Sequence, residues 1–150
     1  MKIISSAFEH NSPIPSLYTC DGENINPPLE FLDVPENTVS LALIMEDPDV
    51  PKHLRTDGMW NHWVVWNMPS STKGIEKNTT APGITGLSTS GVNAYGGPCP
   101  PDKEHRYYFK LFALDIEPEL LPQSTKTDFE KSMKGHIIEE AHLIGTYNRR

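Results

Sequence analysis

The chain has 150 residues, of which 37% are hydrophobic and 22% charged, and it carries a formal net charge of −7. This length is typical of a single domain, residues 1–150, whose hydrophobic core suffices for folding without disulfides or a structural metal. The acidic balance argues against nucleic-acid binding, which needs a concentrated basic surface. Here the only dense basic cluster is Arg149 and Arg150.

Fourteen prolines and ten glycines are spread along the chain. Because proline does not fit inside helices or central strands, they argue against a bundle of long helices and predict many turns and ordered loops. No stretch approaches the roughly 18 consecutive apolar residues of a membrane span. The early charge at Glu9 argues against a secretory signal, so we expect a cytoplasmic protein in which Cys20 and Cys99 are reduced thiols.

Short apolar runs bounded by breakers predict the strands. Residues 40–46, 62–67 and 107–115 are rich in aliphatic, β-branched and aromatic side chains, and the first two stop at a residue that precedes proline. Such runs are too short for core helices and are typical of buried strands. Residues 2–6 and 143–147 are weaker strand candidates.

Helices are expected only late in the chain. Residues 127–135 begin with Thr127 as a candidate N-cap and end at Gly135, and residues 136–142 form a candidate second short helix. Strands first and helices last favour a mainly β fold, most simply an antiparallel two-sheet β-sandwich with short peripheral helices near the C-terminus. A long irregular stretch, residues 69–104, holds six glycines and is expected to be an ordered, functional loop.

Three groups of polar side chains lie at strand ends, where pockets form. Asp47 and Asp49 follow the first buried strand, His62 begins the second between two tryptophans, and His105-Arg106-Tyr107 opens the third. Each signal alone has a plain structural reading: a rigid turn with solvated acids, or a core imidazole bonded to the backbone. Together they predict an acidic turn and two histidines meeting at one cavity.

These motifs, with the segment 95–101 (Tyr-Gly-Gly-Pro-Cys-Pro-Pro), resemble the phosphatidylethanolamine-binding protein family, also called Raf kinase inhibitor proteins. Segments 18–22, 26–29 and 143–147 and the pair Gly135-His136 are similar to its compact bacterial branch. The resemblance implies a Greek-key β-sandwich with one small anion-binding pocket, no cofactor or metal, and no agreed catalytic reaction, so we expect a non-enzyme. The matching pocket positions are Asp47, Asp49, His62, Gly97, Pro98, His105 and Tyr107.

The resemblance also implies the partners. We expect a phosphate-bearing small molecule or lipid head group in the pocket, a regulated protease or kinase as a protein partner, and a homodimer. Two features depart from the family. Lys103-Glu104 precede His105 where the family has Gly-x, so the turn there is expected to differ. The chain ends at Arg150 without the C-terminal helix of the mammalian branch, which predicts an open mouth or one closed by a second subunit.

We hypothesise that His62 and His105 donate ring N–H groups to the anion, with the Tyr107 hydroxyl and a backbone N–H near Gly97. Asp47 is expected to accept from an imidazole and fix its tautomer. Imidazolium donors predict tighter binding near pH 6 than near pH 8. Arg106 is expected to be a structural ion-pair partner.

The alternative is a metal-assisted or acid/base hydrolase that uses the same two histidines and two aspartates. Against it, the sequence has no HExxH or CxxC spacing and no serine in a nucleophile elbow, since Ser88 and Ser90 lie in the long loop.

Overall fold

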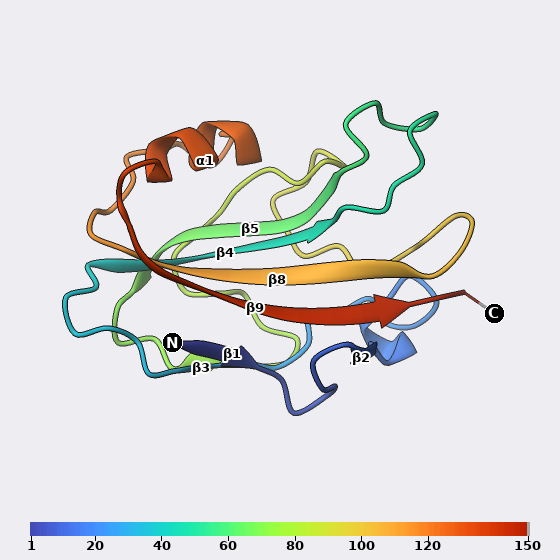
Figure 1. Ribbon diagram of the computed structural model, residues 1–150, viewed down its shortest axis with the longest axis horizontal. Coiled ribbons are helices and arrows are strands. Elements are labelled where there is room, and N and C mark those ends of the chain that lie inside the picture. Colours follow the sequence, from blue (N-terminus) through green and yellow to red (C-terminus); the bar gives the residue numbers. More distant parts are fainter. Residues whose placement is uncertain (150) are drawn as a thin grey trace.

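The computed structural model describes residues 1–149 and shows two β-sheets (Figure 1). The larger sheet has the strand order β2-β9-β8-β4-β5-β7 and the smaller one the order β1-β3-β6. All neighbouring strands are antiparallel except β2 and β9, which are parallel. The strands are β1 (Lys2–Ile4), β2 (Ser12–Pro13), β3 (Leu29–Leu32), β4 (Ser40–Asp47), β5 (Trp60–Pro69), β6 (Gly74–Ile75), β7 (Ile84–Thr85), β8 (His105–Leu114) and β9 (Ile137–Tyr147).

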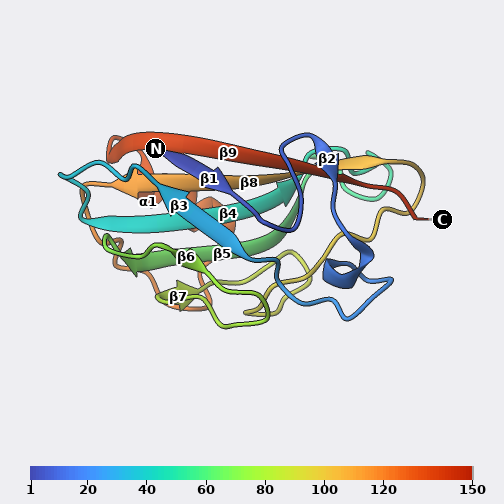
Figure 2. The ribbon, with the colours of Figure 1, turned by 90° about the horizontal axis from the view of Figure 1, so that it is seen from below.

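The central strand β4 is buried along its whole length because both faces of the large sheet are covered. Leu41, Leu43 and Met45 point into the main core, which the small sheet covers (Figure 2). Ala42 and Ile44 point to the opposite face, where a second cluster packs under the helix. A strand buried on both faces reads as a continuous apolar run, which is the pattern that predicted it. The mainly β, two-sheet fold is therefore confirmed.

One α-helix, α1 (Lys126–Met133), occurs among residues 1–149, and a 3-10 turn covers Ser16–Tyr18. The N-cap of α1 is Thr125, not the expected Thr127. The Thr125 side chain accepts a hydrogen bond from the Asp128 amide, and the Asp128 side chain accepts one from the Thr125 amide, which together form a capping box. Phe129 anchors the helix by stacking on Trp66 with ring centroids 5.5 Å apart.

The predicted second helix, residues 136–142, is wrong. Ile137–Tyr147 is one long strand, β9, which pairs with β8 from Ile137 to Tyr147 with one register shift near its start. Ala141, Leu143 and Gly145 lie at alternate positions facing the core, as expected for a strand. The strand therefore begins at Ile137, before the predicted start at residue 143. Within residues 1–149, no helix has the length and apolar character needed to cross a membrane.

The end of the large sheet at the right of Figure 1 positions the site. Here β4 ends at Asp47, which pairs with Trp60 at the start of β5, and β8 begins at His105. The three strand ends that carry the predicted polar groups therefore meet at one edge of the molecule.

Candidate functional site

A cavity of about 370 Å³ opens at this end of the sheet. Five of the seven predicted site residues line it: Asp47, His62, Gly97, His105 and Tyr107. Apolar side chains, among them Val50, Leu54 and Trp60, form part of the rim. The strand ends and the segment 96–101 thus enclose a small, partly apolar cleft with a few polar groups, which is the usual form of a small-ligand site.

His62 lies in β5 and is only 8% exposed. Its Nδ1 is 2.8 Å from the carbonyl oxygen of Gly96. A carbonyl can only accept, so Nδ1 carries the proton. Burial, opposed by that hydrogen bond, lowers the pKa of His62 to about 4. The ring is therefore neutral near pH 7, and the expectation that it is an imidazolium donating into the cavity is wrong.

His105 is fully buried and lies between two carboxylates. Its Nδ1 donates to Asp47 Oδ2 at 2.6 Å and its Nε2 donates to Asp102 Oδ1 at 2.7 Å. Burial acts to lower the pKa of His105, but the two carboxylates outweigh it and raise that pKa. The predicted contact between Asp47 and an imidazole is confirmed, and His105 is the histidine that carries a positive charge.

Asp102 was missed by the sequence reasoning. It stands three residues before His105 in the turn that departs from the family pattern, and its side chain is 41% exposed. Lys103 in that turn does not adopt a left-handed φ, so the turn avoids the conformation that glycine would favour. The only signal available was a carboxylate close in sequence to a candidate histidine.

Tyr107 is the one residue of the cavity lining with a buried polar side-chain atom that has no hydrogen-bond partner among residues 1–149. The residue is fully buried, and its hydroxyl makes no hydrogen bond within residues 1–149, although the Cys99 amide lies near enough to lower the pKa of the phenol slightly. Burial, with the negative charge of Asp47, raises that pKa overall, so the hydroxyl keeps its proton and is a donor. Its ring meets the His62 ring edge-on, with centroids 5.4 Å apart.

Two predicted site residues do not line the cavity. Asp49 turns away to Arg106, whose Nε and Nη2 atoms donate to the carboxylate at 2.9 and 2.7 Å. Arg106 is therefore an ion-pair partner, as expected, and it holds the pKa of Asp49 below its usual value. Pro98 contributes a backbone contact, since its carbonyl accepts from the Cys20 amide at 3.1 Å.

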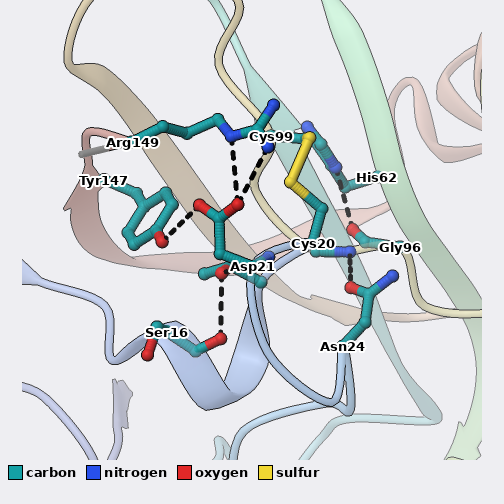
Figure 3. The surroundings of a disulfide bond; sticks show 11 residues. Ser16, Cys20, Asp21, Asn24, His62, Gly96, Cys99, Tyr147 and Arg149 are labelled. Atoms are coloured by element: carbon teal, nitrogen blue, oxygen red, sulfur yellow. Dashed lines mark hydrogen bonds and ion pairs between the residues drawn. A yellow bond between two sulfur atoms is a disulfide. The ribbon is translucent and has the colours of Figure 1, made fainter.

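A disulfide joins Cys20 and Cys99 at the wall of the cavity (Figure 3). The expectation of reduced thiols is wrong, because the loops that carry the two residues are brought side by side although 79 positions separate them in sequence. Gly97 fits this close approach, since a Cβ there would lie 2.2 Å from the Tyr18 carbonyl oxygen. Its amide donates to Asn24 Oδ1 at 2.8 Å and is not free for a ligand.

A family model described as phosphatidylethanolamine-binding protein matches residues 4–148. The chain belongs to the phosphatidylethanolamine-binding protein family. Curated relatives include UPF0098 proteins of Chlamydia pneumoniae, 49% identical over 99% of both chains, and of Methanothermobacter thermautotrophicus, 44% identical over 99% of both. The family resemblance expected from the motifs is thereby confirmed.

Solved structures support the same assignment. A homologue of phosphatidylethanolamine-binding protein from Chlamydia trachomatis superposes with a TM-score of 0.96 at 44% identity, covering 99% of this chain and 97% of that one. YbcL of Escherichia coli, a member of the same family, gives 0.90 at 27% identity, covering 99% and 98%. The fold of this family member is thus shared along almost the whole chain.

Within residues 1–149, nothing in the site points to the hydrolase alternative. In the part of the chain that the structure describes, no group of three or more His, Cys, Asp or Glu side chains has the arrangement of a metal site. The hydroxyls of Ser88 and Ser90, which line the cavity, bond to each other at 2.8 Å. Neither a metal centre nor a serine–histidine pair therefore points to the alternative function.

Proposed function

We propose that this protein binds a small ligand with a phosphate-type head group in the cavity, and that binding rather than catalysis is its chemistry. The observation that carries the proposal is the Tyr107 hydroxyl, a protonated donor sealed beneath the cavity lining, which has no hydrogen-bond partner among residues 1–149. Leaving a buried polar group unpaired costs about 1–3 kcal/mol. A ligand oxygen that accepts from this hydroxyl would recover that cost.

Modest affinity is expected because the cavity has no net positive charge. One imidazolium, His105, is flanked by the carboxylates of Asp47 and Asp102, and His62 is neutral. Recognition therefore depends on a few hydrogen bonds, each contributing about 1.5–3 kcal/mol when one partner is charged. After the cost of association, this corresponds to dissociation constants roughly in the micromolar to millimolar range.

The test is Tyr107→Phe, titrated with inorganic phosphate and phosphoethanolamine by calorimetry. Removing the hydroxyl should weaken binding about tenfold, the loss of one hydrogen bond to a charged ligand. The same variant should unfold in urea with an unchanged free energy or one raised by about 1 kcal/mol, because an unpaired buried donor disappears. A gain in stability with a loss of affinity is the signature of a group kept for a ligand.

Tyr108→Phe is the matched control, since its hydroxyl lies on the outer side of β8 and accepts from Arg106 at 3.2 Å. It should leave affinity unchanged. Equal affinity of the Tyr107→Phe variant and the wild type would refute the proposal.

Three further statements stay predictions: regulation of a protease or kinase partner, a homodimer, and a cytoplasmic location. The last was argued from the early charge at Glu9, with reduced thiols as its consequence, and the Cys20–Cys99 disulfide is a bond more typical of an oxidising compartment. A pull-down with the wild type and with Tyr107→Phe would show whether any protein partner depends on the occupied cavity.

A further inference from the structure

We propose that His62 selects the protonation state of the ligand: it accepts a hydrogen bond from the P–OH group of a hydrogen phosphate, so that phosphate monoesters and inorganic phosphate are preferred over anions with no proton to give. The inference rests on the proposed function and names its ligand class. Sulfate and phosphodiesters, including the phosphate of phospholipid head groups, are also tetrahedral oxyanions, but they carry no proton on the oxyanion that could be donated to His62.

Hydrogen bonds to Gly96 determine the tautomer of His62. The Gly96 carbonyl accepts from Nδ1 at 2.8 Å, and the Gly96 amide donates back to the His62 carbonyl oxygen at 3.1 Å. This reciprocal pair of bonds fixes both the ring orientation and the position of the proton. The neutral ring therefore carries its proton on Nδ1 and leaves a lone pair on Nε2.

The Nε2 lone pair of His62 faces the cavity. Nε2 has no hydrogen-bond partner among residues 1–149, and it is not one of the unpartnered polar atoms that are sealed from solvent. His62 lines the cavity, so Nε2 opens on it. An acceptor on Nε2 needs a donor on the ligand, and a fully deprotonated oxyanion has none.

Tyr107 is the aromatic neighbour of His62 at the cavity. The Tyr107 ring packs against the His62 ring, and the Tyr107 hydroxyl is the unpartnered donor described above. The cavity lining thus carries an open acceptor, His62 Nε2, and beneath it an unpartnered donor on the contacting ring, the Tyr107 hydroxyl. The P–OH of hydrogen phosphate complements the open acceptor, and an oxygen of the same ligand complements the donor when it displaces the lining above that hydroxyl.

The charged groups around His62 keep it neutral. Burial is the main cause of its lowered pKa, and the positive charge of His105 on β8 adds to it. Asp47 on β4 is already bonded to His105, and Cys99 in the loop is locked in the disulfide. Above about pH 5 the ring therefore remains an acceptor, and pH acts on binding through the ligand. The dianion of a phosphate monoester takes up a proton near pH 6 and then carries a P–OH donor, so the affinity for monoesters should rise between pH 8 and pH 6.

Calorimetric titration at pH 6 with methyl phosphate, inorganic phosphate, dimethyl phosphate and sulfate tests the inference on the full chain. We expect the first two to bind at least about tenfold more tightly than the last two. Equal binding of dimethyl phosphate or sulfate overturns the selection by His62 and leaves the proposed function standing. Failure of all four anions to bind overturns both.

The tautomer can be observed directly. A long-range ¹H–¹⁵N spectrum should show Nε2 of His62 unprotonated from pH 8 down to about pH 5, and a proton on Nε2 in that range overturns the inference. His62→Gln offers an amide that can donate as well as accept, so the preference for methyl phosphate over sulfate should fall to about twofold or less. If this variant does not fold, the spectrum and the anion series on the wild type still decide.

Discussion

Two histidines line the same cavity and carry different charges. His62 bonds through Nδ1 to a carbonyl, and burial keeps it neutral; His105 bonds through both nitrogens to carboxylates, and they keep it protonated although it is buried more completely. Burial alone would have made both rings neutral. The difference shows that the partner of each ring nitrogen decides what a buried histidine can offer a ligand.

The largest effect should come from breaking the charged half of this comparison. Asp47→Ala leaves His105 without its buried partner, so the free energy of unfolding should fall by about 3–5 kcal/mol, measured by urea denaturation at pH 7. Asp49→Ala removes a more exposed ion pair with Arg106 and should cost about 1 kcal/mol or less. Similar losses for the two variants would contradict the contrast between the buried and exposed pairs.

The pH dependence of stability should separate the two rings. The folded pKa of His62 is about 4, against an ordinary value of 6.5, so between these values the unfolded chain binds a proton that the folded chain does not. Acidification from pH 6.5 to 4 should therefore remove about 3 kcal/mol of stability. His105, with a raised pKa, acts oppositely: its contribution is present below pH 6.5 and is lost as the pH rises through its folded pKa.

Urea denaturation from pH 4 to 9 measures both slopes. His62→Gln should flatten the curve between pH 6.5 and 4 while leaving the alkaline side unchanged. An unchanged acid slope in that variant would mean that His62 titrates normally in the folded protein.

The smallest effect concerns the exposed carboxylate on His105. Asp102→Asn keeps an acceptor for Nε2 but removes one negative charge beside the cavity, so phosphate should bind roughly threefold more tightly at low salt. The gain should shrink as salt screens the interaction. Asp33→Asn, at an exposed loop position outside the cavity lining, is the control. Weaker phosphate binding by Asp102→Asn would contradict the role given to its charge.

The strands of the large sheet were predictable because burial on both faces left continuous apolar runs, as in β4 and β8. The first half of β9 was not. Ile137 and Ile138 are followed by two glutamates, a pattern that also fits one face of a short helix. Pairing with β8 across the sheet, a long-range interaction absent from the local sequence, decides the outcome.

The site was predictable in its residues more than in its chemistry. The motifs brought Asp47, His62, His105 and Tyr107 to one cavity, as the structure does. The charge of each ring depends on Gly96 and Asp102, which lie in loops whose conformation no local pattern determines. The disulfide was equally unpredictable from local sequence, because it requires two loops that are distant in the chain to meet at the cavity wall.

That covalent link also bears on the thermodynamics of recognition. Besides the Cys20–Cys99 bond, the same two loops are joined by the hydrogen bond from the Tyr95 hydroxyl to the Tyr18 carbonyl at 2.7 Å. The wall is thus organised before any guest molecule arrives, and few torsions remain to be frozen on association. The selectivity of such a cavity follows from its fixed geometry, and even a ligand of very few atoms can bind without a rearrangement of the protein.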